Sequence, residues 1–131
     1  MATGTNLVSA KWVEGTVQKF VGKFTDASSV AGGTAIEFDD ALPDFDGVTI
    51  LDGSVTFTGT VAGDGKLGTS SDDDGIIEAS AVTVVGGLAH GTGDLVGTTT
   101  TDTQVVFETD GTINAGAEVF VTVDYACGDL T

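Results

Sequence analysis

Residues 117–127 read Ala-Glu-Val-Phe-Val-Thr-Val-Asp-Tyr-Ala-Cys, and this stretch decides the fold. Every second side chain is apolar, and most of the side chains between them are polar. A period of two is typical of a strand with one face in the core and the other in water. Burial contributes roughly 1.5 to 3 kcal/mol for each large apolar side chain. The core face carries Val119, Val121, Val123 and Tyr125, so we predict a core strand here.

The composition favours strands joined by tight turns. The 131 residues include 20 glycines and one proline, and the only basic residues are four lysines and one histidine. Threonine and valine, which favour strands, are abundant. A chain of this length fits one domain with a single core, so residues 1–131 are predicted as one domain. Residues 1–12 are predicted as an extended N-terminal arm, with a poorly ordered end as the alternative.

Seven or eight short strands are expected, separated by turn residues. Residues 11–24 have a spacing that also fits an amphipathic helix, but Gly15, Gly22 and the β-branched residues favour a strand. Asp52-Gly53 between alternating segments predicts a hairpin with a type I′ turn. Residues 62–74 are predicted as a long loop, and a short strand is expected near residues 94–96. The pattern indicates an all-β protein formed by a single β-sandwich, with the jelly roll as one form of it.

The chain is strongly acidic, with a formal net charge of −16. A negative field of this size repels the phosphates of nucleic acids and the head groups of anionic membranes, so neither is an expected partner. Two interpretations of the charge stay open: solubility in a salty medium, and an acidic face that recognises a cation or a basic partner. Residues 1–25 differ, since they hold three lysines against the single acidic residue Glu14. Their lysines either dock onto another acidic surface or are simply solvated.

One acidic run is a candidate calcium site. Asp72, Asp74 and Gly75 resemble the start of a calcium-binding loop, but the glutamate of the helical motif would fall at Thr83 in a predicted strand. A looser site built on Asp72 and Asp74, or on the acids of residues 39–46, stays open beside a solvated acidic loop. No other metal site and no cofactor are predicted.

The residues give no catalytic motif. The single histidine, His90, and the single cysteine, Cys127, are far apart in the sequence, and no Gly-x-Ser-x-Gly is present. Trp12 is interpreted as a packing anchor, with a sugar-stacking platform as the alternative. Twenty acids always permit some carboxylate pair, but nothing singles one out. No catalytic residue is predicted, and the chain is expected not to be an enzyme.

Three runs in the second half of the chain carry a family resemblance. They are residues 66–77 (Lys-Leu-Gly-Thr-Ser-Ser-Asp-Asp-Asp-Gly-Ile-Ile), 101–107 (Thr-Asp-Thr-Gln-Val-Val-Phe) and 115–125 (Ala-Gly-Ala-Glu-Val-Phe-Val-Thr-Val-Asp-Tyr). With them, Gly65 to Tyr125 resembles the β-sandwich decoration, or cement, proteins of tailed bacteriophages and related head-fibre modules. The resemblance covers about half of the chain.

The resemblance implies a virion structural protein. Such proteins bind the outside of the major-capsid lattice, often as trimers, and reinforce it against internal DNA pressure. The chain would then be made in the host cytoplasm and lie on the outer capsid surface, binding the lattice without catalysis and self-associating, with a homotrimer as the expected form. Candidate capsid or inter-subunit contacts are Lys11, Trp12, Lys19 and Lys23. The alternative is an adhesive or carbohydrate-binding module of a viral fibre or cell surface, and a small acidic enzyme is a third possibility.

Overall fold

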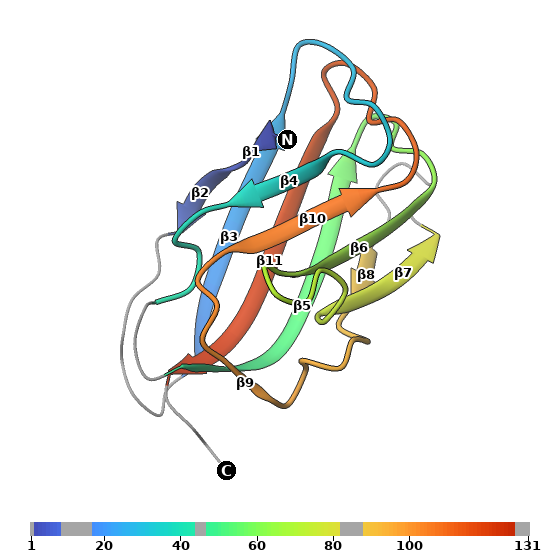
Figure 1. Ribbon diagram of the computed structural model, residues 1–131. Coiled ribbons are helices and arrows are strands. Elements are labelled where there is room, and N and C mark those ends of the chain that lie inside the picture. Colours follow the sequence, from blue (N-terminus) through green and yellow to red (C-terminus); the bar gives the residue numbers. More distant parts are fainter. Residues whose placement is uncertain (1, 9–16, 44–46, 82–87, 128–131) are drawn as a thin grey trace.

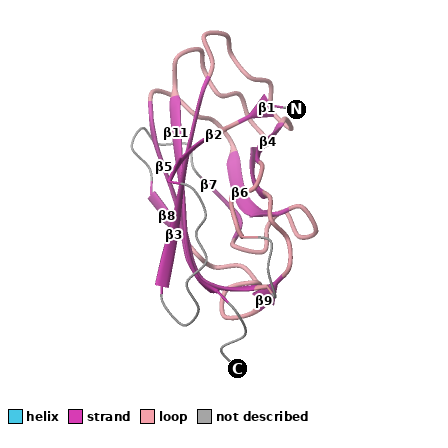
Figure 2. Ribbon diagram, turned by 90° about the vertical axis from the view of Figure 1, so that its left-hand side faces the viewer, coloured by secondary structure: helices cyan, strands magenta, loops and turns pink. Residues whose placement is uncertain are grey.

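The computed structural model describes residues 2–8, 17–43, 47–81 and 88–127. The described chain is all β and forms two sheets that pack face to face (Figures 1 and 2). In spatial order, the five-stranded sheet contains β1 (Ala2–Thr3), β4 (Ala35–Phe38), β10 (Val105–Thr109), β6 (Asp64–Thr69) and β7 (Ile77–Ala81). The six-stranded sheet contains β2 (Thr5–Val8), β3 (Val17–Thr25), β11 (Glu118–Cys127), β5 (Val48–Thr58) and β8 (Leu88–His90), with β9 (Thr99–Thr100) paired to β5. Within the described ranges, no helix has the length and hydropathy needed to span a membrane.

The strand order is that of a jelly roll. Without β1 and β2 of the N-terminal arm and the two-residue β9, eight strands remain. When these eight are numbered along the chain, the order across one sheet is first, eighth, third and sixth, and the order across the other is second, seventh, fourth and fifth. This double Greek-key arrangement is a jelly roll. The predicted β-sandwich is therefore confirmed, in its jelly-roll form.

β11 is the central strand of the six-stranded sheet and matches the strand predicted for residues 117–127. It pairs antiparallel with β3 on one side and with β5 on the other. Val119, Val121, Val123 and Tyr125 are fully buried, as the alternation predicts. The core also holds large side chains from both sheets, among them Phe20, Phe38, Phe57, Phe107, Ile36 and Leu67. Burial of this many apolar side chains between two sheets is the main stabilising contribution to the fold.

The predicted hairpin at Asp52-Gly53 is wrong, because β5 runs through both residues without a turn. Asp124 pairs with Asp52 and Tyr125 with Ile50, so Leu51 is the extra residue of a β-bulge. Gly53 faces the other sheet, where a β-carbon would overlap the Ile76 side chain. The glycine thus permits close packing of the two sheets, whereas the sequence pattern had suggested a turn.

Two further expectations from glycine-rich segments are also wrong. Residues 62–74 contain β6, which pairs with β10 and β7 on its two sides. Its glycines made a loop the natural prediction, yet a β-carbon at Gly68 would overlap the backbone of Asp72, which folds back over the strand. Residues 94–96 form a turn between β8 and β9, in which Leu95 donates its backbone N–H to the carbonyl of Gly75 at 2.7 Å.

The described part of the N-terminal arm is extended and lies along one edge of the sandwich (Figure 1). β1 pairs in parallel with β4 in one sheet, and β2 pairs antiparallel with β3 in the other. Between them, Gly4 donates its backbone N–H to the carbonyl of Glu37 at 2.9 Å. A β-carbon at Gly4 would overlap the Phe38 ring. Residues 2–8 therefore close this edge of the core.

Candidate functional site

Four strands of the six-stranded sheet present a continuous outer surface that contains two of the four predicted contact residues. We call it the β3–β11 face. It includes these outward side chains of β2, β3, β11 and β5: Leu7, Val17, Lys19, Val21, Lys23, Glu118, Phe120, Thr122, Asp124, Asp52, Thr56 and Thr58. Lys11 and Trp12, the other two predicted contact residues, lie outside the described residues.

The two lysines of the β3–β11 face are paired with acids on the neighbouring strand. Lys23 Nζ lies 2.8 Å from Glu118 Oε2, and Lys19 Nζ lies 3.8 Å from Asp124 Oδ1. Lys23 Nζ also lies 5.8 Å from the centre of the Phe120 ring, within the range of a cation–π contact. The hydrogen bond from Lys23, with one from Thr58, holds the pKa of Glu118 below its usual range. Asp52 lies opposite Asp124 on the same face. The lysines predicted to be a basic docking feature thus belong to a surface on which each lysine has an acidic partner and the acids are in slight excess.

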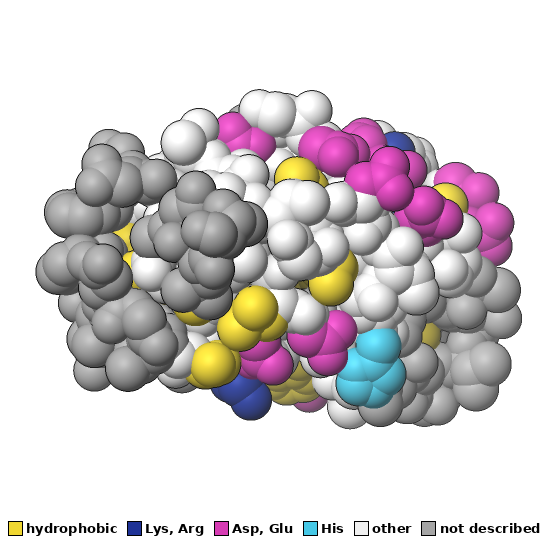
Figure 3. All heavy atoms as spheres, turned by 90° about the horizontal axis from the view of Figure 1, so that it is seen from below, with side chains coloured by type: hydrophobic (Ala, Val, Ile, Leu, Met, Phe, Trp, Pro, Cys, Tyr) yellow, Lys and Arg dark blue, Asp and Glu magenta, His cyan; other side chains and the backbone are white. Residues whose placement is uncertain are grey.

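Apolar side chains accompany these ion pairs. Leu7 is 52% exposed and Val17 is 67% exposed, while Val21 and Phe120 are half-buried on the same face. A hollow of about 300 Å³ opens beside Leu7, and its lining also includes Lys23 and Phe24. Seen from below, hydrophobic side chains lie beside a lysine and acidic groups (Figure 3). The face therefore combines paired charges with exposed apolar groups, as protein-binding surfaces do.

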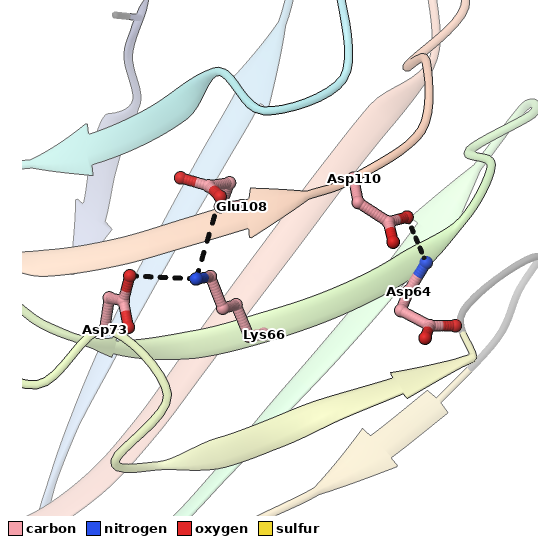
Figure 4. A network of polar contacts seen from close by, with 5 residues as sticks. All are labelled: Asp64, Lys66, Asp73, Glu108 and Asp110. Carbon is pink, nitrogen blue, oxygen red and sulfur yellow. Dashed lines mark hydrogen bonds and ion pairs between the residues drawn. The ribbon is translucent and has the colours of Figure 1, made fainter.

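The outer side of the five-stranded sheet is acidic. Lys66 on β6 pairs with Asp73 at 2.9 Å and with Glu108 at 3.7 Å (Figure 4). The hydrogen bond with Asp73, and the charges around it, raise the pKa of Lys66 despite its partial burial. Asp110 accepts the backbone N–H of Asp64 at 2.7 Å. Asp64, Lys66, Ala79, Glu108 and Asp110 line a hollow of about 200 Å³, in which the acidic side chains outnumber the single lysine.

The predicted calcium candidates Asp72 and Asp74 lie close together in the loop after β6. The hydrogen bond with Asp74 and its negative charge raise the pKa of Asp72, and Asp94 adds to the repulsion. Among the residues that the structure describes, no three acidic, histidine or cysteine side chains converge on a position for a metal ion. Asp44 and Asp46 lie outside the described ranges. The calcium site stays a prediction.

Asp102 holds this loop in place through hydrogen bonds, although no pattern in the sequence indicated it. Its carboxylate accepts hydrogen bonds from the Thr69 hydroxyl at 2.7 Å, the Ser71 hydroxyl at 2.8 Å and the Ser71 backbone N–H at 3.1 Å. Partial burial alone would raise the pKa of Asp102, but these hydrogen bonds outweigh it and hold the pKa below its usual value. The carboxylate thus ties the segment before β10 to the loop that follows β6.

We expect Asp102→Asn to lower the free energy of unfolding by about 2 kcal/mol at neutral pH, because hydrogen bonds to a charged group are lost. A carboxylate with a lowered folded-state pKa stabilises the fold above its ordinary pKa of 3.8, and this stabilisation is lost as the pH falls through the folded-state value. The difference between wild type and Asp102→Asn should therefore shrink below about pH 4 in urea titrations. Asp64→Asn, at an exposed carboxylate, is the control. A difference that stays constant with pH would contradict this role.

The single histidine and the single cysteine take different places. His90 ends β8, where its Nδ1 lies 3.6 Å from Asp52 Oδ2. Burial would raise the pKa of Asp52, but the backbone N–H groups of Gly91 and Gly53, with His90, keep it lowered. Cys127 is fully buried at the end of β11. The two side chains lie in different surroundings, so the structure does not bring them together as a nucleophile and base.

Comparisons with known proteins find the fold in phage capsids. No protein-family model matches the chain, and no curated protein matches it. A chain in the capsid of Ralstonia phage GP4 is similar with a TM-score of 0.67 and 18% identity, over 89% of this chain and 88% of that one. A chain in the capsid asymmetric unit of cyanophage Pam1 has a TM-score of 0.56 and 16% identity, over 86% and 85%. Across nearly its whole length, the chain therefore has a fold that also occurs in phage capsids.

Proposed function

We propose that this chain is a structural protein of a tailed-phage virion that binds the outer surface of the capsid lattice and stabilises it, without catalysis. The similarity to a chain of the Ralstonia phage GP4 capsid carries the proposal, since it extends over 89% of this chain and 88% of that one. Nearly all of each chain is thus accounted for by the shared jelly roll. In this proposal the partners are the major capsid protein and further copies of the chain, with a homotrimer as the expected form.

The surface of the described chain suits binding better than turnover. Two hollows on it, a partly apolar one beside β2 and an acidic one beside β6, are both open and small. His90 and its partner Asp52 are both well exposed, with side-chain exposures of 63% and 45%, so water screens their interaction. The adhesive or carbohydrate-binding alternative has the same fold class, because jelly rolls also occur in lectins. A glycan-binding screen of the purified protein separates the two proposals.

The N-terminal segment is the proposed contact region for the capsid or for a neighbouring copy. Lys11, Trp12, Lys19 and Lys23 are its candidate residues, and a buried tryptophan is a common anchor of protein interfaces. Removing residues 1–12 is an unsuitable test, because residues 2–8 pair with both sheets and cover Phe38. Single substitutions leave these strands in place.

We expect Trp12→Ala to weaken binding to capsid shells by about 30-fold or more, the effect of losing an interface anchor. The shells are those of the phage whose genome encodes the chain, and binding is measured by co-sedimentation. Lys11→Ala should also weaken binding. Ala79→Glu, at an exposed residue of the other sheet, makes the same change in net charge and should not weaken it. A wild-type protein that stays in the supernatant at saturating shell concentration would refute the proposed function.

A further inference from the structure

The N-terminal arm contributes little apolar burial of its own. Of the arm residues 2–7, whose burial the structure describes, none is buried, and only Ala2 is a partly buried hydrophobic residue packed against the core. Leu7, the largest apolar side chain among them, is 52% exposed. The buried partner belongs to the sandwich, where the Phe38 ring lies against the Gly4 backbone. The arm thus gains apolar burial mainly by covering one ring.

The arm also leaves open space where it crosses from one sheet to the other. Thr5 pairs with Lys23 on β3, and Thr3 pairs with Glu37 on β4. The hollow of about 300 Å³ lies beside this crossing, lined by Thr3, Thr5 and Leu7 of the arm and by Lys23, Phe24 and Thr25 of β3. Protein cores are close-packed and contain few voids larger than a water molecule. The arm therefore lies along the edge of the sandwich without filling it.

One side chain of the arm has a polar partner in the turn after β4. The side-chain amide nitrogen of Asn6 donates a hydrogen bond to the backbone carbonyl of Asp39 at 2.9 Å. The carboxylate of Asp39 in turn accepts a hydrogen bond from the side-chain amide of Gln104. The next residue, Asp40, has a φ of 55° and is the one non-glycine residue with positive φ in the described chain. Such a conformation persists only where surrounding contacts hold it, so the turn presents a fixed acceptor to Asn6.

We infer that the arm is a strap that opens while the sandwich stays folded, and that the hydrogen bond from Asn6 to Asp39 is its latch. Segments that bury few apolar groups and are held by hydrogen bonds at an exposed edge open locally, at a lower free energy than global unfolding requires. The arm fits this description, since its contacts include the latch and the hydrogen bond from the Gly4 backbone N–H to the carbonyl of Glu37. Loss of the latch should therefore favour the open arm without unfolding β11.

An open arm changes what the molecule presents to other chains. It frees the outer edges of β3 and β4 and uncovers Phe38. Residues 9–16, which include Lys11 and Trp12, join the arm to β3. Opening therefore leaves these residues attached to the sandwich at one end only, which extends the reach of two residues proposed to contact the capsid. The opening itself does not depend on that proposed function.

Native-state hydrogen exchange of the purified protein, measured by NMR, tests the inference. We expect the Gly4 amide to exchange about 100-fold or more faster than the slowest amides of β11. Low urea concentrations should leave the Gly4 rate unchanged, because local opening exposes little surface, but should speed exchange in β11, which requires global unfolding. A Gly4 amide that is as slow as those of β11 and responds to urea in the same way would overturn the inference, because the arm would then open only with the sandwich.

Two variants test the latch. Asn6→Leu keeps the approximate size and shape of the side chain but cannot donate a hydrogen bond. It should speed exchange at Gly4 by about 5- to 10-fold, the effect of losing one hydrogen bond, and leave the rates in β11 unchanged. Thr5→Val removes an exposed hydroxyl from the adjacent arm residue and is the matched control, which should exchange like wild type. Equal Gly4 rates in the two variants would reject Asn6 as the latch. Faster exchange in β11 as well would show that Asn6 stabilises the whole sandwich.

Discussion

Phe38→Ala is expected to lower the free energy of unfolding by about 3 to 5 kcal/mol, the usual cost of removing a buried phenylalanine. Phe38 is fully buried and its ring contacts Phe20 edge-on, with the ring centres 5.7 Å apart. It also lies under Gly4 and close to Gly22, where added β-carbons would overlap or crowd its ring. The side chain thus connects β4, β3 and the N-terminal arm, so its loss should loosen the arm as well as the core.

A second substitution tests whether the N-terminal arm contacts the core at Phe38. Gly4→Ala should destabilise the wild type, because the new methyl group meets the Phe38 ring. In the Phe38→Ala background the same change should cost much less, since the ring is gone. Urea denaturation of the four proteins measures this coupling. Phe120→Ala, at a half-buried ring on the outer surface, is the control and should cost less than Phe38→Ala. Equal costs of Gly4→Ala in both backgrounds would show that the arm does not contact Phe38.

Local sequence patterns predicted the strands whose side chains alternate. β11 follows a period of two, and Val119, Val121, Val123 and Tyr125 are buried as expected. A strand was also the right choice for the described part of residues 11–24, which belongs to β3, because glycine and β-branched residues weigh against a helix there. These predictions succeeded because a half-buried strand shows its alternation of apolar and polar side chains within a few consecutive residues.

Predictions failed where a glycine makes room for a residue that is not its neighbour in the local sequence pattern. Gly53 and Gly68 lack side chains because Ile76 and the backbone of Asp72 occupy the space. Both contacts depend on how the chain folds back on itself. The local pattern therefore predicted a turn at Gly53 and a loop at Gly68. Long-range contacts of this kind cannot be read from propensity, which concerns neighbouring residues.

The same reason limits the prediction of the binding surface. The sequence indicated Lys19 and Lys23 as candidates, but their partners Asp124 and Glu118 follow only from the register of β3 against β11. The register thus places an acid beside each of the two lysines, so the segment does not form a basic surface. Asp102 was missed for a similar reason, since its hydrogen-bond donors Thr69 and Ser71 come from a loop about 30 residues earlier.

Gly53→Ala should lower the free energy of unfolding by about 1 to 3 kcal/mol, the usual cost of overpacking a core. A β-carbon there would overlap Cγ2 of Ile76 and lie 3.3 Å from a methyl carbon of Leu67. The backbone itself is not the cause, because Gly53 is not among the described glycines with positive φ. Ile76→Ala removes the overlapping methyl group and creates space. The cost of Gly53→Ala should therefore fall by about 1 kcal/mol or more in the Ile76→Ala background.

Gly33→Ala is the matched control for this cycle. Gly33 has a φ of 82° and open space around a β-carbon. An alanine there would strain the backbone, because L residues disfavour a positive φ, but it would not clash with a neighbouring atom. Its cost should be the same with and without Ile76→Ala, because nothing near residue 33 changes. Denaturant titration of all six proteins gives both couplings. If Gly53→Ala behaved like Gly33→Ala, the glycine would be needed for its backbone, as in a hairpin turn. A dependence on Ile76 would instead show that the two sheets require a residue without a side chain at this point, where they pack closely.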